Sequence, residues 1–201
     1  MERIADLSQL DIQDGVYSYA DYLTWQFDQA VELVKGKIFP MSAPNRRHQG
    51  ISRELTVTFH AHFKGNPCSF YAAPFDVRLY DKRKSAKANR DVLTVVQPDI
   101  CVICDRDKLD DKGCLGAPDL VVEILSPGNS SKEMKLKKML YEESGVREYW
   151  IIDPEHETAF QFHLTDATVY SPATIYVSDD VLNCVVFPGL TVSLSAVFES
   201  F

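Results

Sequence analysis

The feature that most constrains the fold is a glutamate in the middle of an apolar run. Residues 118–127 read PDLVVEILSP, with Glu123 between Val122 and Ile124. The run is short, rich in β-branched residues and bounded by prolines, which is typical of a strand covered on both faces of a sheet. A carboxylate in such a strand loses much of its hydration. We therefore expect Glu123 to have a cation, a metal ion or a proton as its partner.

A second apolar run, residues 97–104, has its only acid, Asp99, at its entrance. Side chains alternate along a strand, so Asp119, Val121 and Glu123 share one face of the first run. If the two strands are neighbours, Asp99 approaches Glu123. Paired carboxylates of this kind suit a divalent metal ion.

A lysine-rich helix follows the Glu123 strand at once. Lys137 and Tyr141 are four residues apart and share a helix face with Glu133. We expect that face to pack back over the preceding strand, so that Lys137 supplies the counter-charge. Further basic residues form two clusters that flank the acidic strands in sequence: Lys82, Arg83, Lys84, Lys87 and Arg90 in a polar connection, and Lys132, Lys135 and Lys138 on the helix. A solvated loop and a solvated helix face remain the alternative interpretation of these clusters.

Two further acids lie in apolar segments. Glu32 belongs to a strand, residues 31–34, that forms a hairpin with residues 37–41 across Lys35-Gly36. It is either an edge carboxylate in solvent or a supporting residue of the site. Asp76, in a strand predicted over residues 71–80, is more readily explained as facing solvent. Glu32, Asp76 and Tyr141 are the candidate supporting residues.

The remaining elements complete an α/β chain of the α+β type, with a mixed sheet. The chain begins with a short helix from Ser18 to about residue 30, followed by the hairpin, a helix over 46–64 capped by Asn45 and the strand over 71–80. The two central strands come next, separated by a charged turn region over 105–117, and then the lysine helix, which ends at Gly145. A strand over 146–154, an antiparallel extension and a terminal helix over 193–201 complete the chain. The unit of strand, lysine helix and strand should cross over right-handedly. His48, His60 and His62 lie on the helix over 46–64, where we expect surface or capping groups and no ligands.

Composition and charge limit the class of protein. At 201 residues the chain fits one domain, and its net charge of −8 and pI near 5.1 argue against a generic nucleic-acid coat protein. No run approaches the roughly 18 apolar residues of a membrane helix, and no signal-peptide core is present, so we expect a cytoplasmic protein with no membrane partner. The five cysteines are expected to be reduced, and Cys101 and Cys104 to be buried structural thiols, because no second CxxC lies downstream.

Several motifs in this order resemble the PD-(D/E)XK nuclease superfamily and, more narrowly, the Uma family of bacterial restriction endonuclease-like proteins. They are residues 18–22 (SYADY), 31–36 (VELVKG), 47–49 (RHQ), 96–100 (VQPDI), 116–127 (GAPDLVVEILSP) and 145–154 (GVREYWIIDP). The resemblance covers about residues 18–191. It implies a restriction-endonuclease-like fold with a central mixed sheet flanked by helices, formed by a single domain over residues 1–201 with a lead segment over 1–17.

The resemblance also implies a metal-dependent endonuclease that hydrolyses phosphodiester bonds in DNA. Asp99 and Glu123 would bind Mg²⁺ or Mn²⁺, with the Ile124 carbonyl as a third ligand. The chain departs from the superfamily pattern because Leu125 stands where a lysine is expected. Lys137 matches the position to which this lysine has moved in the Uma family, with Lys138 the weaker candidate. DNA contacts would come from Lys82, Arg83, Lys84, Lys135 and Lys138, and a homodimer would suit cleavage of two strands.

Two alternatives remain open from the sequence. One is a catalytically inactive nuclease-fold protein that binds DNA or a protein partner. Two intact acids in buried strands weigh against it. The other is an unrelated α/β hydrolase or metal-binding enzyme. The chain has no GxSxG motif, no P-loop and no Cys/His pair at catalytic spacing to support it.

Overall fold

The computed structural model describes residues 3–80, 89–127, 131–166 and 168–199. Within these ranges the chain forms four α-helices and two six-stranded sheets, together with a small two-stranded sheet. The helices are α1 (Tyr19–Tyr22), α2 (Arg46–Phe63), α3 (Ser131–Ser144) and α4 (Leu194–Phe198). The strands are β1 (Val31–Val34), β2 (Lys37–Pro40), β3 (Ser69–Ala72), β4 (Val77–Leu79), β5 (Thr94–Val96), β6 (Ile100–Ile103), β7 (Leu109–Asp110), β8 (Gly113–Leu115), β9 (Leu120–Ile124), β10 (Glu148–Asp153), β11 (Thr158–His163), β12 (Thr174–Val177), β13 (Val181–Asn183) and β14 (Thr191–Ser193). None of the described helices is long and apolar enough to cross a membrane.

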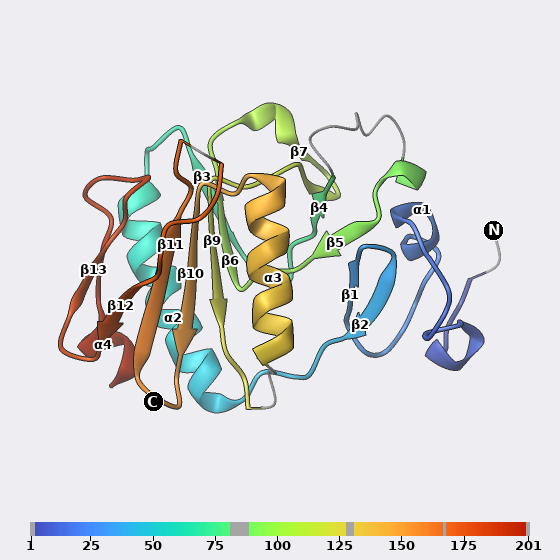
Figure 1. Ribbon diagram of the computed structural model, residues 1–201, viewed down its shortest axis with the longest axis horizontal. Helices are drawn as coiled ribbons and strands as arrows, with labels where there is room; N and C mark the ends of the chain where they lie inside the picture. Colours follow the sequence, from blue (N-terminus) through green and yellow to red (C-terminus); the bar gives the residue numbers. More distant parts are fainter. Residues whose placement is uncertain (1–2, 81–88, 128–130, 167, 200–201) are drawn as a thin grey trace.

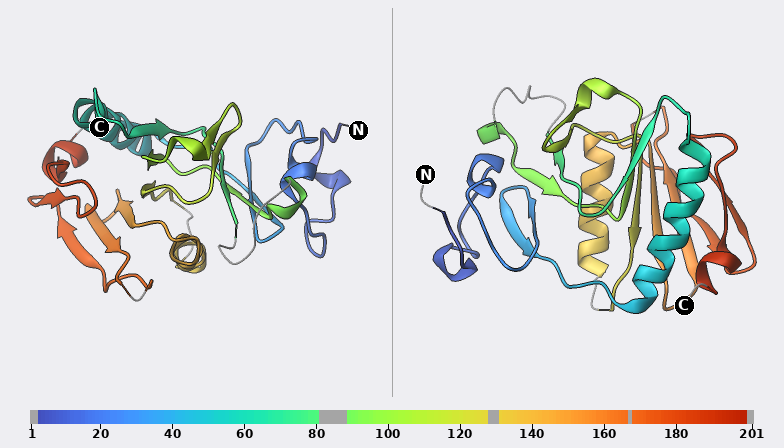
Figure 2. Two further views of the ribbon diagram at one scale, coloured as in Figure 1. Left: turned by 90° about the horizontal axis from the view of Figure 1, so that it is seen from above. Right: turned by 180° about the vertical axis from the view of Figure 1, so that it is seen from behind.

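The central sheet has the strand order β12-β11-β10-β9-β6-β3. Its β9 and β10 strands are parallel and joined by α3, whereas its other neighbouring strands are antiparallel. Helices α2 and α3 lie on opposite faces of this sheet (Figures 1 and 2). The predicted fold class, a mixed sheet flanked by helices, is therefore confirmed.

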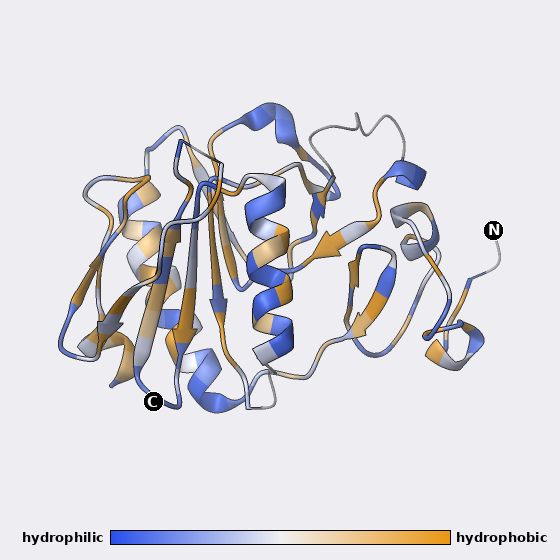
Figure 3. Cartoon of the chain, viewed as in Figure 1, coloured by the Kyte–Doolittle hydropathy of each residue, from blue (hydrophilic) through white to orange (hydrophobic). Residues whose placement is uncertain are grey.

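The two long helices, α2 and α3, each pack an apolar surface on one face of the central sheet. Four residues of α2 at a spacing of four, Ile51, Leu55, Phe59 and Phe63, are buried against the β6, β9 and β10 side chains that point to that face. On the opposite face, α3 contributes Leu140 and Tyr141. The hydropathy colouring shows the apolar strands at the centre and a mixed surface on α3 (Figure 3). Burial of each large side chain stabilises the fold by about 1.5–3 kcal/mol, so α2 anchors its face firmly.

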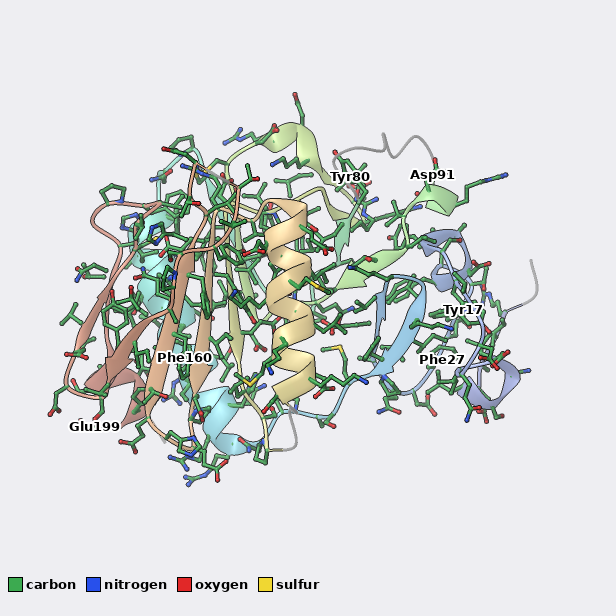
Figure 4. The ribbon with its side chains drawn as sticks, in the orientation of Figure 1. Tyr17, Phe27, Tyr80, Asp91, Phe160 and Glu199 are labelled. Carbon is green, nitrogen blue, oxygen red and sulfur yellow. A yellow bond between two sulfur atoms is a disulfide. The ribbon has the colours of Figure 1, made fainter. Side chains whose placement is uncertain are left out.

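The second sheet has the order β2-β1-β5-β4-β8-β7 and lies toward the N-terminal end of the molecule (Figure 1). The predicted hairpin is present as β1 and β2, with Lys35 and Gly36 both at positive φ in the turn. An aromatic cluster that includes Tyr17, Trp25 and Phe27 packs beside this hairpin. Tyr17 and Phe27 are labelled at that end of the molecule in Figure 4, where Phe160 marks β11 of the central sheet. The sequence did not predict this second sheet as a separate unit.

Three predicted elements differ in the structure. The first helix ends at Tyr22 and does not continue to residue 30. The strand predicted over residues 71–80 is two strands in different sheets, β3 and β4, separated at Pro74, which has no N–H to donate to a ladder. The turn region over 105–117 contains a short 3₁₀ helix (Arg106–Lys108) and the β7–β8 hairpin.

The prediction that the cysteines are reduced is wrong for one pair. Cys68 and Cys104 form a disulfide because β3 lies antiparallel to β6 and brings together residues 36 apart in sequence. Cys104 is therefore not a structural thiol. Cys101, Cys114 and Cys184 are free and buried, as expected of cysteines that act as small apolar side chains.

Candidate functional site

The two acids of the central strands lie beside one another. Strands β6 and β9 are neighbours, with Ile100 paired to Val122, so Asp99 comes opposite Glu123. The Ile124 N–H donates to Asp99 Oδ2 at 2.7 Å. The condition for the expected approach of the two acids, that β6 and β9 are neighbours, is met, and it puts both carboxylates at one end of the strand pair.

Lys137 joins these strands to the second sheet. Its Nζ donates to Glu123 Oε1 at 2.9 Å and to Glu32 Oε1 at 3.0 Å. Glu32 comes from β1 and also accepts the Gln97 N–H at 3.0 Å, while the Tyr141 hydroxyl donates to Glu123 Oε1 at 2.6 Å. One ammonium thus lies between two carboxylates from different sheets.

Burial and charge set the protonation states of this group. Burial raises the pKa of Glu123 to about 7, and the nearby Glu32 and Asp99 carboxylates add to this while the Lys137 ammonium opposes it. Burial alone would lower the pKa of Lys137, but Glu123 and Glu32 outweigh burial and raise it above its ordinary value. Lys137 therefore stays charged at neutral pH and acts as a cation, with no capacity to accept a proton.

The site keeps contact with solvent. The exposed fractions of the side chains are 17 % for Asp99, 11 % for Glu123 and 23 % for Lys137. The three side chains are therefore largely, but not completely, buried.

His48 is a residue of this site that sequence reasoning missed. It is buried on the first turn of α2, with its Nε2 atom 3.2 Å from Asp99 Oδ1. Burial lowers the pKa of His48, but the interaction with Asp99 outweighs it, so the pKa is raised overall. The expectation of a surface or capping group is wrong for His48, whereas His60 is exposed. The Arg47-His48-Gln49 motif was the available signal.

Asp76 lies near the group but does not join it. Its Oδ1 accepts from the Gln97 side chain at 2.8 Å and from the Tyr22 hydroxyl at 3.4 Å. Burial raises the pKa of Asp76, so the carboxyl does not simply face solvent. Asp76 and Gln97 line a hollow of about 270 Å³ together with Pro74, Phe75, Asp110, Asp111, Lys112 and Gly113. Gln97, which was not predicted, connects this hollow to Glu32.

The basic residues separate into different environments. The Lys138 ammonium lies 5.0 Å from the centre of the Phe162 ring and 5.8 Å from that of Tyr170, over β11 and away from the two acids. Lys135 is exposed on α3. Lys82, Arg83 and Lys84 lie outside the described residues.

The donor atoms fit a hard divalent cation. No group of three or more His, Cys, Asp or Glu side chains in the described ranges is arranged to enclose a metal ion. Mg²⁺ nevertheless needs only one or two carboxylates, because it keeps several waters and takes further oxygens from a bound phosphate. The expected ligands, Asp99, Glu123 and the Ile124 carbonyl, would supply oxygen atoms only, which favours Mg²⁺ or Mn²⁺ over zinc.

Comparison with known proteins identifies the family. The model of the Uma2 family, described as "Putative restriction endonuclease", matches residues 19–195, which include every group of the site. The chain belongs to the Uma2 family. A solved structure from Anabaena variabilis, described as a putative nuclease of the DUF820 family, matches this Uma2 protein with a TM-score of 0.73 over 91 % of this chain and 98 % of the other, at 20 % identity. That likeness supports the fold.

A curated relative of this Uma2 protein comes from Synechocystis. It is described as the uncharacterized protein slr1290 and is 24 % identical over 149 residues, which cover 73 % of each chain. The predicted resemblance to the Uma family is thus confirmed by the family match.

Proposed function

We propose that this Uma2 protein is a metal-dependent endonuclease that hydrolyses phosphodiester bonds in DNA. Asp99, Glu123 and the Ile124 carbonyl would hold Mg²⁺ or Mn²⁺. When bound, such an ion stabilises charge on the phosphate and lowers the pKa of a coordinated water. Membership of the family described as "Putative restriction endonuclease" supports the reaction class.

The observation that carries the proposal is the position of Lys137. Its ammonium lies 2.9 Å from Glu123 although it comes from a helix and not from the strand. The superfamily pattern expects a lysine two residues after the glutamate, and Leu125 cannot provide one. Lys137 thus offers a cation beside the acids, as the reaction requires.

The residues around the acids have distinct proposed roles. Lys137 would stabilise negative charge on the scissile phosphate or orient the attacking water, because its raised pKa keeps it protonated. Tyr141 and Glu32 would support it, Tyr141 by a hydrogen bond to Glu123 and Glu32 by holding the ammonium. Asp76 would act only through Gln97.

The substrate would be DNA bound by basic side chains. Lys82, Arg83, Lys84 and Lys135 are the proposed phosphate contacts. Lys138 is a weaker candidate because its ammonium already lies over two aromatic rings. We further propose a homodimer, since two related active sites suit cleavage of two strands.

The test is cleavage of supercoiled and single-stranded DNA with Mg²⁺, Mn²⁺ or EDTA. We expect metal-dependent nicking by the native protein and none by Glu123→Ala, because the variant lacks one of the two acids. Glu155→Ala is the matched control, since Glu155 is exposed in the turn after β10. Nicking that persists in Glu123→Ala would contradict the site. A folded native protein that neither cleaves DNA nor binds metal would favour the alternative, an inactive member of the fold that binds DNA or a protein partner.

A further inference from the structure

His48 stands out because it is a buried polar side chain with an unexplained ring atom. Only 7 % of the residue is exposed, and its Nδ1 atom is buried without a hydrogen-bond partner among the described residues. Leaving a buried polar atom unpaired costs free energy, and native structures usually avoid it. A histidine kept under these conditions needs a reason other than packing.

The contact of the other ring nitrogen, Nε2, with Asp99 gives such a reason. Nε2 lies 3.2 Å from Asp99 Oδ1, on one side of the carboxylate, while the Ile124 N–H donates to Oδ2 on the other side at 2.7 Å. Each carboxylate oxygen of Asp99 thus has one neighbour, and the two contacts together limit rotation of the carboxylate group. Each oxygen also keeps a further lone pair with which it can bind an ion.

The start of α2 fixes the backbone of His48. Asn45 caps this helix, and its Oδ1 accepts the His48 N–H at 2.9 Å. Further along α2, Ile51 and Leu55 are fully buried against the central sheet. The backbone of His48 is therefore held from both sides, by the cap before it and by the core after it.

We propose that His48 is a positioning residue that sets the orientation of the Asp99 carboxylate for the metal ion. This inference rests on the proposed function. It adds a residue of α2 to a site whose other members come from strands and from α3. Hydrogen-bond partners of ligating carboxylates commonly change metal affinity or activity on the order of 10–100-fold when removed.

The test compares three variants of the full chain. His48→Ala removes the contact, His48→Gln retains an N–H donor at about the reach of Nε2, and His60→Ala removes an exposed histidine of the same helix. Mn²⁺ binding is measured by calorimetry, cleavage is measured over a range of Mn²⁺ concentrations, and urea unfolding reports the stability of each variant.

The expected result is a loss of Mn²⁺ affinity on the order of 10–100-fold in His48→Ala, recovered at least in part in His48→Gln and absent in His60→Ala. Cleavage by His48→Ala should need correspondingly more Mn²⁺. A merely structural role would lower the urea midpoint and leave the affinity of the folded fraction unchanged, which overturns the inference. A native protein that binds no Mn²⁺ would instead overturn the proposed function, and with it the role of His48.

Discussion

Lys137 and Lys138 are neighbours in sequence with different environments. The Lys137 ammonium contacts Glu32 and Glu123, whereas that of Lys138 lies over the rings of Phe162 and Tyr170. Successive residues of a helix point about 100° apart, so only one of the two can face the strand beneath. The structure thus distinguishes two residues that charge alone would treat as equivalent.

Replacing Lys137 by alanine should lower cleavage by on the order of 10²-fold, as expected when a group that stabilises charge in the transition state is lost. Lys138→Ala is the matched control and should cleave at close to the native rate when DNA is saturating, because its ammonium lies over the Phe162 ring and a weaker DNA contact would not limit the rate under that condition. Steady-state rates at saturating metal measure both. If Lys138→Ala were the impaired variant, the assignment of the lysine would be off by one position.

The raised pKa of Glu123 predicts a pH dependence of metal binding. A proton and a metal ion compete for the same carboxylate, so affinity should rise as pH increases through about 7, the pKa of Glu123. An ordinary glutamate would already be ionised well below that pH. Because Lys137 lowers the pKa of Glu123, Lys137→Ala should move this transition to higher pH. Calorimetric Mn²⁺ titrations at pH values on both sides of 7 would show the shift, and an affinity independent of pH would contradict it.

Strand β10 carries an acid with no connection to the candidate site. Glu148 is fully buried on the face of the central sheet opposite Glu123, and it accepts hydrogen bonds from the Trp150 indole at 2.7 Å and the Gln161 amide at 2.6 Å. The backbone N–H groups of Val185 and Val186 also donate to it. One carboxylate therefore fastens the segment after β13 to β10 and β11.

Glu148→Ala should destabilise the fold by about 3 kcal/mol or more, because several buried donors lose their acceptor at once. Exposed Glu155→Ala provides the control for loss of one negative charge. Urea unfolding followed by tryptophan fluorescence reports both changes, and Trp150 itself lies beside the substituted residue. A change no larger than that of the control would mean that Glu148 is not needed to hold this segment.

At the level of the whole molecule, the sequence predicted the features that depend on the local pattern of apolar and charged residues. The apolar runs around Asp99 and Glu123, and the four-residue spacing of Lys137 and Tyr141, were enough to predict a strand pair covered by a helix. The pairing of Cys68 with Cys104 was not predictable, because it depends on which strands become neighbours. His48 was missed for the same reason, since its partner Asp99 is 51 positions away and only tertiary packing joins them.

The groups of the site come from both sheets, so the proposed metal binding would be linked to global stability. Glu32 belongs to the second sheet and Glu123 to the central one, with Asp99 directly before β6, and Lys137 joins Glu32 to Glu123. The unfolded chain does not hold these groups together, so an ion that binds them stabilises only the folded state. The sheets should therefore unfold at a higher temperature when the ion is present.

We expect Mg²⁺ or Mn²⁺ at 100 times its dissociation constant to stabilise the native protein by about 2.7 kcal/mol, and EDTA to remove the effect. Glu123→Gln should keep its fold but lose the metal-dependent increase in melting temperature, because an amide is a much weaker ligand for a hard cation than a carboxylate. Glu155→Gln should retain the increase. Thermal unfolding of the three proteins with and without metal distinguishes specific binding at the site from a general effect of ions on an acidic surface, since only the specific effect depends on Glu123.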